Sequence, residues 1–193
     1  MAKVSIIGTG TWGIALGMVL AQNGHEVTAW SALPKEIEAL KESYKCKNLP
    51  GVEIPRSIVF TADLQEACTD KEMLVLSVPS VFTRGVAKQM NPFIKEGQLI
   101  VSVAKGIEEK TLMTMSQQIE QELPMANVAV LSGPSHAEEV SRGIPTTVVV
   151  GAKDRQTAEH IQNLFMSSVF RVYTSPDILG IELGGALKNV IAL

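Results

Sequence analysis

A short apolar segment followed at once by a glycine-rich turn restricts the fold of this chain more than any other stretch. Residues 4–7 are mostly apolar, residues 8–13 read G-T-G-T-W-G, and an apolar helical pattern follows from residue 14. The order strand, glycine turn and helix is the context in which a G-x-G-x-x-G motif binds a dinucleotide, whereas the motif alone is weak evidence. The alternative is a glycine turn that only begins an α/β fold.

The three glycines of the turn each have a separate physical task. Gly8 permits the tight turn out of the strand, and Gly10 lets the backbone approach a pyrophosphate because it has no Cβ. Gly13 lets the helix pack against the strand. The N–H groups of the first helical turn then face the phosphates, helped by the helix dipole. The sequence therefore predicts that Gly8, Gly10 and Gly13 form a cofactor-binding turn.

Strands and helices alternate over most of the 193 residues. The runs at 73–78 and 98–103 are almost continuously apolar, which is typical of strands covered on both faces. We therefore predict an α/β fold of the Rossmann type with a doubly wound, mostly parallel sheet. A helix is predicted over residues 110–122. The pattern leaves open whether the later strands, near 146–150 and 171–173, run antiparallel.

The end of the second predicted strand, residues 25–30, bears on the choice of cofactor. An NAD-specific fold places an Asp or Glu there to bind the ribose 2′-hydroxyl. Here residues 31–33 are Ser, Ala and Leu, and Lys35 lies just beyond them. Without an acid a 2′-phosphate meets no repulsion, and Lys35 could face it, so NADP(H) is weakly favoured over NAD(H). A solvated Lys35 without a ligand is the alternative.

Charge and cysteine content exclude several classes of function. The net charge is −3, with 17 basic and 20 acidic residues, so no basic surface for nucleic acid or anionic lipid is expected. No apolar segment is long enough to span a bilayer. Cys46 and Cys68 lack metal-binding or redox spacing, and no metal-ligand cluster emerges. We expect free thiols in a reducing cytoplasm and no metal site.

Two predicted strand ends carry residues that could take part in chemistry. Lys105 directly follows a buried strand, where ligands of such sheets collect, and could bind an anionic or carbonyl oxygen. An exposed loop lysine is the alternative. Residues 135–138 read S-H-A-E, a capping box that predicts Ser135 as the cap of a helix. The same helix start could offer N–H groups to a ligand, and His136 is a weaker candidate for a general base.

The last segment contains a lysine in an apolar setting. Residues 175–177 read S-P-D, a typical helix start, and apolar residues surround the helix that follows, so we predict that it is buried. Lys188 lies within it, and a buried lysine is costly unless it is paired or used. Gly184, one turn earlier, leaves room for a substrate. Lys188 is therefore the candidate proton-transfer residue, the alternative being a lysine that reaches the surface.

The same helix predicts the domain organisation. Its apolar pattern continues to Leu193 without a glycine, a proline or a cap. We expect residues 1–174 to form a cofactor-binding domain and residues 175–193 to begin a second, all-α domain that continues beyond them. An uncovered apolar helix would also favour self-association, so a homodimer is possible.

Five motifs, taken together, resemble a known family. They are GTGTWG at 8–13, VAKG at 103–106, LSGPS at 131–135, FRVY at 170–173 and GGALKN at 184–189. In this order they closely resemble the NAD(P)-dependent glycerol-3-phosphate dehydrogenases of the bacterial type. The resemblance implies an oxidoreductase that interconverts dihydroxyacetone phosphate and sn-glycerol 3-phosphate with NADPH or NADH. That reaction feeds glycerophospholipid synthesis in the cytoplasm.

The resemblance also implies roles for individual residues. The residues implied to contact the cofactor are Thr11, Trp12, Lys105 and Ala137. Those implied to approach the substrate are Lys105, Gly133, Ser135 and Lys188, with Lys188 transferring the proton. Two departures stand out: residues 31–33 lack the basic residue often found there, and the helical second domain that holds the substrate phosphate is absent.

Two alternative functions remain open at this level. These 193 residues could be a dinucleotide-binding module that is inactive alone, since the phosphate-holding groups are missing. A related hydroxyacid dehydrogenase would also place a lysine on a helix after the sheet.

Overall fold

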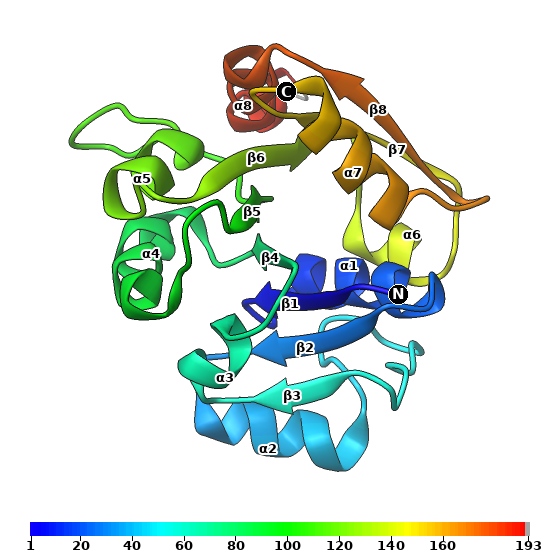
Figure 1. Ribbon diagram of the computed structural model, residues 1–193. Helices are drawn as coiled ribbons and strands as arrows, with labels where there is room; N and C mark the ends of the chain where they lie inside the picture. Colours follow the sequence, from blue (N-terminus) through cyan, green and yellow to red (C-terminus); the bar gives the residue numbers. More distant parts are fainter. Residues whose placement is uncertain (192–193) are drawn as a thin grey trace.

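In the computed structural model, which describes residues 1–191, the chain forms one 8-stranded sheet with helices on both faces (Figure 1). The spatial order is β3-β2-β1-β4-β5-β6-β7-β8. The predicted Rossmann-type α/β fold is therefore confirmed. The strands are β1 Lys3–Ile7, β2 Glu26–Trp30, β3 Val59–Thr61, β4 Met73–Leu76, β5 Leu99–Ser102, β6 Asn127–Ser132, β7 Thr146–Gly151 and β8 Phe170–Ser175.

Strand direction divides the sheet into two parts. Strands β1 to β6 are parallel, whereas β7 pairs antiparallel with β6 and β8 pairs parallel with β7. The last two strands therefore run against the first six, which answers the question that the sequence left open. The chain order reverses between β1 and β4, and ligands of such sheets bind at the carboxyl ends of the strands beside this point.

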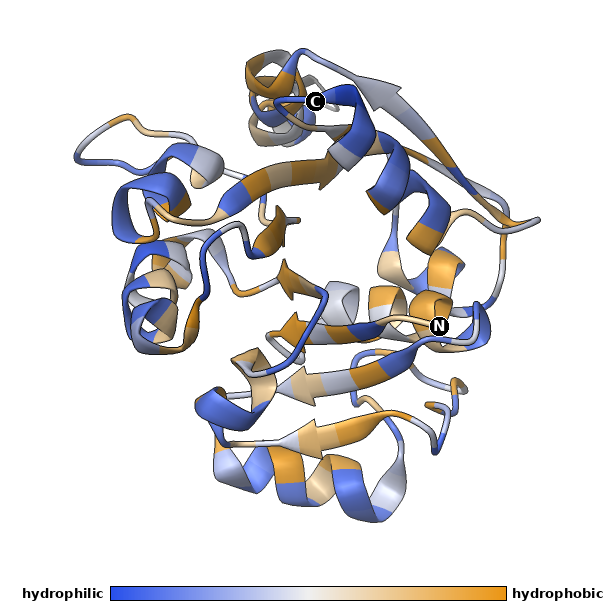
Figure 2. Cartoon of the chain, in the orientation of Figure 1, coloured by the Kyte–Doolittle hydropathy of each residue, from blue (hydrophilic) through white to orange (hydrophobic). Residues whose placement is uncertain are grey.

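The helices bury two apolar clusters, one on each face of the sheet. They are α1 Thr11–Gln22, α2 Pro34–Ser43, α3 Leu64–Cys68, η1 Ser80–Phe82, α4 Thr83–Met90, η2 Asn91–Phe93, α5 Met115–Glu122, α6 Ala137–Ser141, α7 Arg155–Phe165, α8 Ile178–Ala186 and α9 Lys188–Ile191. Because side chains of a strand alternate between faces, Met73 and Val75 join the cluster of α1 and α7, and Leu74 joins that of α4 and α5. Figure 2 shows the central strands as hydrophobic between more hydrophilic outer helices.

The helix predicted over residues 110–122 is shorter than expected. It begins at Met115, because Thr114 and Gln117 form a capping box there. The preceding residues form a loop that is closed by a bridge between Ile107 and Thr114. The prediction missed this start because the loop contains no glycine or proline after Gly106 that would mark it.

The prediction of one long buried helix after residue 177 was wrong. Among the described residues of α8 only Glu182 is buried, while Leu179 and Leu183 are 52% and 38% exposed. The helix ends at Ala186, and α9 begins at Lys188. A helix with apolar residues on all sides contacts the sheet along one side only, so its other leucines face outward. Within residues 1–191, no helix is both long and apolar enough to cross a bilayer.

The path of α8 follows from the reversed strands. Its start lies beside the carboxyl end of β7, where a Cβ on Gly151 would be 3.3 Å from the Cα of Ile178. Its end lies beside the carboxyl end of β6, where a Cβ on Gly185 would be 2.9 Å from Ser132 Oγ. The helix therefore runs from β7 to the neighbouring β6 and brings Lys188 to the edge that carries the glycine turn.

Candidate functional site

The glycine turn connects β1 to α1 at the carboxyl edge of the sheet. Gly8 has a φ of +118°, and a Cβ on it would lie 2.9 Å from backbone atoms of Ser77 and Val78. Its N–H donates to the carbonyl oxygen of Trp30 at 2.9 Å, which joins the turn to β2. Backbone conformation and space thus both require glycine at this position.

The start of α1 is open to a ligand. Gly10 is its N-cap, no side chain caps the helix, and no acid lies in its first turn. A Cβ on Gly10 would meet no atom within 4 Å, so the backbone faces free space. Free N–H groups at an uncapped helix start attract phosphate groups. The turn therefore fits the pyrophosphate of a dinucleotide.

Two polar side-chain atoms beside the turn lack a partner. Thr9 Oγ1 and Trp12 Nε1 are buried and make no hydrogen bond within the described part of the chain. A buried hydrogen-bonding group without a partner is costly and calls for an explanation. A bound cofactor could supply the partners, which is a second observation that fits a dinucleotide here.

Ser77, which directly follows β4, contacts this turn, and the sequence interpretation did not single it out. Its Oγ donates to the carbonyl oxygen of Gly8 at 2.7 Å, across the point where β1 and β4 lie side by side. A Cβ on Gly13 would collide with this Oγ and with the Gly8 oxygen. The signal in the sequence is a lone hydroxyl near the end of an apolar strand. Ser77 thus fixes the turn from the neighbouring strand.

A pair of lysines lies further along the same edge. Lys105, which follows β5, donates from Nζ to the carbonyl oxygen of Gly133 at 3.0 Å. Lys188, which begins α9, donates from Nζ to the carbonyl oxygen of Ser135 at 3.4 Å. Burial lowers the pKa of Lys105, and the nearby charge of Lys188 lowers that pKa further. The four residues implied to approach the substrate are therefore close together.

A groove beside this pair has room for a small substrate. It has a volume of ≈ 360 Å³ and lies between α8 and the carboxyl end of β6. Its lining includes Ser132, Gly133, Pro134, Gly184, Gly185 and Lys188. A Cβ on Gly184 would meet no atom within 4 Å, so the free space expected at this glycine is present.

The segment after β6 differs from its prediction in one respect. Ser135 does not cap the following helix: the N-cap of α6 is His136, and no side chain caps it. Ser135 is buried instead, and its Oγ lies 3.5 Å from the carbonyl oxygen of Gly133. His136 is exposed, and Ala137 packs against the core at the start of α6. The backbone turn after Gly133 displaces the helix start by one residue.

The glycine turn and the lysine pair belong to one continuous edge. The glycine turn follows β1, Lys105 follows β5, and Ser135, which Lys188 contacts, follows β6. Because β4 lies between β1 and β5, about three strand spacings, roughly 14 Å, separate β1 from β6. The loops are in contact, since a Cβ on Gly106 would lie 3.1 Å from Ser80 after β4. An extended dinucleotide lying across this edge would place its two ends over different strands.

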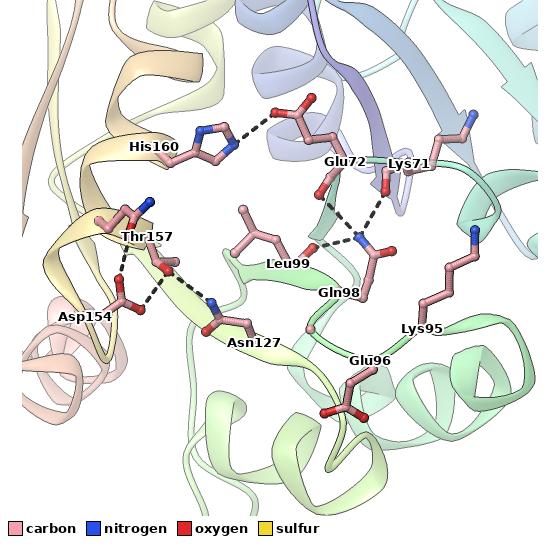
Figure 3. A pocket seen from close by; sticks show the side chains of 12 residues that line it. Lys71, Glu72, Lys95, Glu96, Gln98, Leu99, Asn127, Asp154, Thr157 and His160 are labelled. Atoms are coloured by element: carbon pink, nitrogen blue, oxygen red, sulfur yellow. Dashed lines mark hydrogen bonds and ion pairs between the residues drawn. The ribbon is translucent and has the colours of Figure 1, made fainter.

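A larger cavity lies at the opposite edge, at the amino ends of β4, β5 and β6 (Figure 3). Its volume is ≈ 640 Å³. Several of its charged groups are paired, His160 with Glu72 and Lys95 with Asp70, each at 3.0 Å. Across residues 1–191 no group of three or more His, Cys, Asp or Glu residues is arranged to hold a metal ion. We assign no ligand to this cavity.

Comparison with known proteins agrees with this geometry. A family model described as the N-terminus of NAD-dependent glycerol-3-phosphate dehydrogenase matches residues 3–158. Relatives named glycerol-3-phosphate dehydrogenase (NAD(P)+) from Agathobacter rectalis and Fusobacterium nucleatum are 62% and 55% identical over the whole chain. The crystal structure of glycerol-3-phosphate dehydrogenase from Coxiella burnetii has a TM-score of 0.93 at 29% identity, covering 99% of this chain and 59% of that one.

The chain spans 58% of the length of these two relatives. The family match covers all of the strands from β1 to β7, the glycine turn and Lys105, but not Lys188. The chain therefore belongs to the family defined by the N-terminal part of NAD-dependent glycerol-3-phosphate dehydrogenase.

Proposed function

We propose that the protein interconverts dihydroxyacetone phosphate and sn-glycerol 3-phosphate with NAD(P)H, and so serves glycerophospholipid synthesis. One observation supports this most: Lys105 and Lys188 converge on the segment of Gly133 and Ser135, beside the groove. Two neighbouring cations suit an anionic, phosphorylated substrate. The names of the relatives point to the same reaction.

The cofactor is proposed to lie on the edge formed by the glycine turn. Gly8, Gly10 and Gly13 shape the turn, and Thr11 and Trp12 form the first turn of α1. Ala137 and Lys105 complete the proposed set from α6 and the loop after β5. When bound, the nicotinamide supplies or accepts a hydride at the C2 carbon of the substrate. The chain's own residues bind it and orient it.

Lys188 is the proposed proton-transfer residue. In reduction its ammonium group donates a proton to the oxygen that develops negative charge, and in oxidation its amine takes that proton back. Lys105 stabilises charge on the neighbouring oxygens.

The test is the substitution Lys188→Met in a protein of the relatives' full length. General acid–base catalysis contributes about 10²–10⁴-fold, so turnover should fall by this factor while cofactor binding stays nearly unchanged. Lys153→Met, which removes an exposed lysine paired with Glu120, is the matched control and should keep its activity. Near-normal turnover of Lys188→Met would refute the assignment.

A second candidate is a dinucleotide-binding module without turnover, which the match to a family region described as an N-terminus favours. The 193 residues would then bind NAD(P)H and leave dihydroxyacetone phosphate unchanged. An assay with that substrate and NADPH separates the two functions, because robust turnover excludes the module. Activity assays of the full-length protein with a panel of hydroxyacids test the alternative that it is a related hydroxyacid dehydrogenase.

Assembly and location complete the proposal. Exposed Leu179, Leu183 and Leu187 at the end of the chain support a homodimer. Light scattering after size-exclusion chromatography tests it, and a monomer at all concentrations would contradict it. Cys46 and Cys68 are free, which supports the reducing cytoplasm.

A further inference from the structure

The carboxyl end of β2 carries an acid that comes from a helix and not from the strand. The strand ends at Trp30, and α2 begins at Pro34 with Glu36 in its first turn. Ser31 Oγ donates to Glu36 Oε2 at 2.6 Å. Ser31 itself is 6% exposed, and its Oγ accepts the N–H of Leu33 at 3.2 Å. A carboxylate is therefore held at this strand end by a buried hydroxyl.

This carboxylate is connected to the glycine turn through the end of β2. The N–H of Gly8 donates to the carbonyl oxygen of Trp30, one residue before Ser31. In folds of this type, the adenosine ribose of the dinucleotide lies at the carboxyl end of the second strand, where an acid accepts its 2′-hydroxyl. Glu36 thus occupies the region in which NAD and NADP differ.

The carboxylate of Glu36 is available to a ligand. Its second oxygen, Oε1, accepts no hydrogen bond from residues 1–191, and the side chain is only half-buried. No Lys, Arg or His of the described chain forms an ion pair with it, and the neighbouring Lys35 is exposed. One acceptor oxygen and an uncompensated negative charge therefore remain at this point.

We propose that Glu36 accepts a hydrogen bond from the ribose 2′-hydroxyl of NAD(H) and repels the 2′-phosphate of NADP(H). The inference rests on the proposed function, because it requires a dinucleotide on this edge. It reverses the weak preference for NADP(H) that residues 31–33 suggested. Residues 31–33 contain no acid, but Glu36, five positions after Ser31, contacts Ser31 through its side chain and so supplies a carboxylate at this strand end.

The competing explanation is that Ser31 and Glu36 only stabilise the start of α2. A contact of that kind would affect the stability of the protein and would not distinguish two nucleotides that differ at a single hydroxyl. Discrimination between NADH and NADPH is therefore the quantity to measure, alongside thermal unfolding of each variant.

The experiment is a calorimetric titration of the full-length protein with NADH and with NADPH. Wild type should bind NADH about tenfold more tightly, because a carboxylate near a 2′-phosphate repels it. Glu36→Gln keeps a side chain of the same size and removes the charge, so NADPH binding should tighten about tenfold and NADH binding should change little. Glu38→Gln removes an exposed carboxylate from the same helix and should leave both affinities unchanged.

The outcomes separate this inference from the function on which it rests. Tighter binding of NADPH than NADH by wild type, or equal responses of both nucleotides to Glu36→Gln, would overturn the role of Glu36 while leaving dinucleotide binding intact. If a folded wild type bound neither nucleotide, the proposed function itself would fail.

Discussion

At the scale of single residues, the two lysines of the site influence one another. Lys105 is partly buried, and the positive charge of Lys188 adds to the effect of burial in lowering the pKa of Lys105. A lower pKa means that an ammonium group gives up its proton more readily. The pKa of Lys105 therefore depends in part on Lys188, the residue proposed to transfer the proton.

Lys188→Met should raise the pKa of Lys105 towards the ordinary range for lysine. Loss of the neighbouring positive charge favours the protonated form of Lys105, although burial, the larger cause, still lowers its pKa. Nuclear magnetic resonance titration of ¹³C-dimethylated lysines would measure the shift. Lys153→Met provides the control, and an unchanged Lys105 titration in the Lys188 variant would contradict the coupling.

The two cysteines should react at very different rates. Burial raises the pKa of the Cys68 thiol to about 12, so almost no reactive thiolate exists at neutral pH, and the side chain is inaccessible. Cys46 is only partly buried. An aromatic disulfide reagent should therefore modify one thiol per folded chain quickly and the second only on unfolding. Cys46→Ser should abolish the fast phase; a fast phase that persists would contradict this assignment.

At the scale of elements, α8 is attached to α5 through a buried carboxylate. Glu182 accepts hydrogen bonds from the N–H of Ser116 at 2.8 Å and from its Oγ at 2.6 Å. Glu182 is only 9% exposed, and the N–H groups at the start of α5 favour a negative charge there. The sequence interpretation missed this contact because 66 positions separate the two residues.

Glu182→Ala should lower the free energy of unfolding by about 2 kcal/mol, because two buried donors of Ser116 lose a charged acceptor. Urea unfolding followed by circular dichroism measures the change. Glu159→Ala removes an exposed carboxylate from an ion pair with Arg155 and should cost about 0.5 kcal/mol or less. Equal effects of the two substitutions would show that Glu182 does not attach α8.

The loop before α5 is held by an ion pair that acid should weaken. Arg84 on α4 pairs with Glu108 at 2.7 Å and with Glu122 at 2.7 Å. Hydrogen bonds from Arg84 and Thr111, together with the Arg84 charge, lower the pKa of Glu108 from 4.5 to about 2. A depressed folded-state pKa contributes stability above the unfolded value, and that contribution is lost as the pH falls towards 2.

Arg84→Met should therefore lower the melting temperature at pH 7. The difference in melting temperature between wild type and this variant should become smaller as the pH falls from 4.5 to about 2. Thermal unfolding at several pH values measures this difference. Arg142→Met is the control, since Arg142 donates to the carbonyl oxygen of Pro50 and not to a carboxylate, so its effect should not change with pH. A difference for Arg84→Met that is constant with pH would exclude this pair as the cause.

Local patterns predicted some elements and missed others for physical reasons. The glycine turn and the buried strands depend on short-range rules, and the structure agrees with them. The cap at Ser135 was wrong, because a backbone turn that no local rule describes moves the helix start. The exposure of α8 depends on how distant elements pack, which a single sequence does not display. The Glu36 contact spans only five positions, but no pattern used in the sequence interpretation places an acid of the first turn of α2 on Ser31.

At the scale of the whole molecule, hydrogen bonds just after the C-terminal end of α1 link the parallel part of the sheet to the part with reversed strands. Asn23, just after α1, donates from Nδ2 to the carbonyl oxygens of Leu164 at 2.9 Å and Met166 at 3.3 Å, at the end of α7. His25 Nε2 lies 3.1 Å from the same Leu164 oxygen. These contacts connect the helix of the glycine turn to the reversed strands.

Asn23→Ala should reduce the free energy of unfolding by about 1–2 kcal/mol, because two partly buried carbonyl groups lose a donor. Gln22→Ala, at the exposed neighbouring position, is the matched control and should have little effect. Hydrogen exchange of β7 and β8 amides should also become faster in the Asn23 variant. Unchanged exchange there would show that the two parts of the sheet are held together elsewhere.

The route of α8 from β7 to β6 has a consequence for how the chain can vary. Each helical residue advances by about 1.5 Å and rotates by about 100°. A deletion between Asp177 and Lys188 would therefore withdraw the amine from the groove and swing it to another side, even though every contacting residue remained. The length of this stretch is therefore constrained by the positions of its two ends, beside β7 and beside β6.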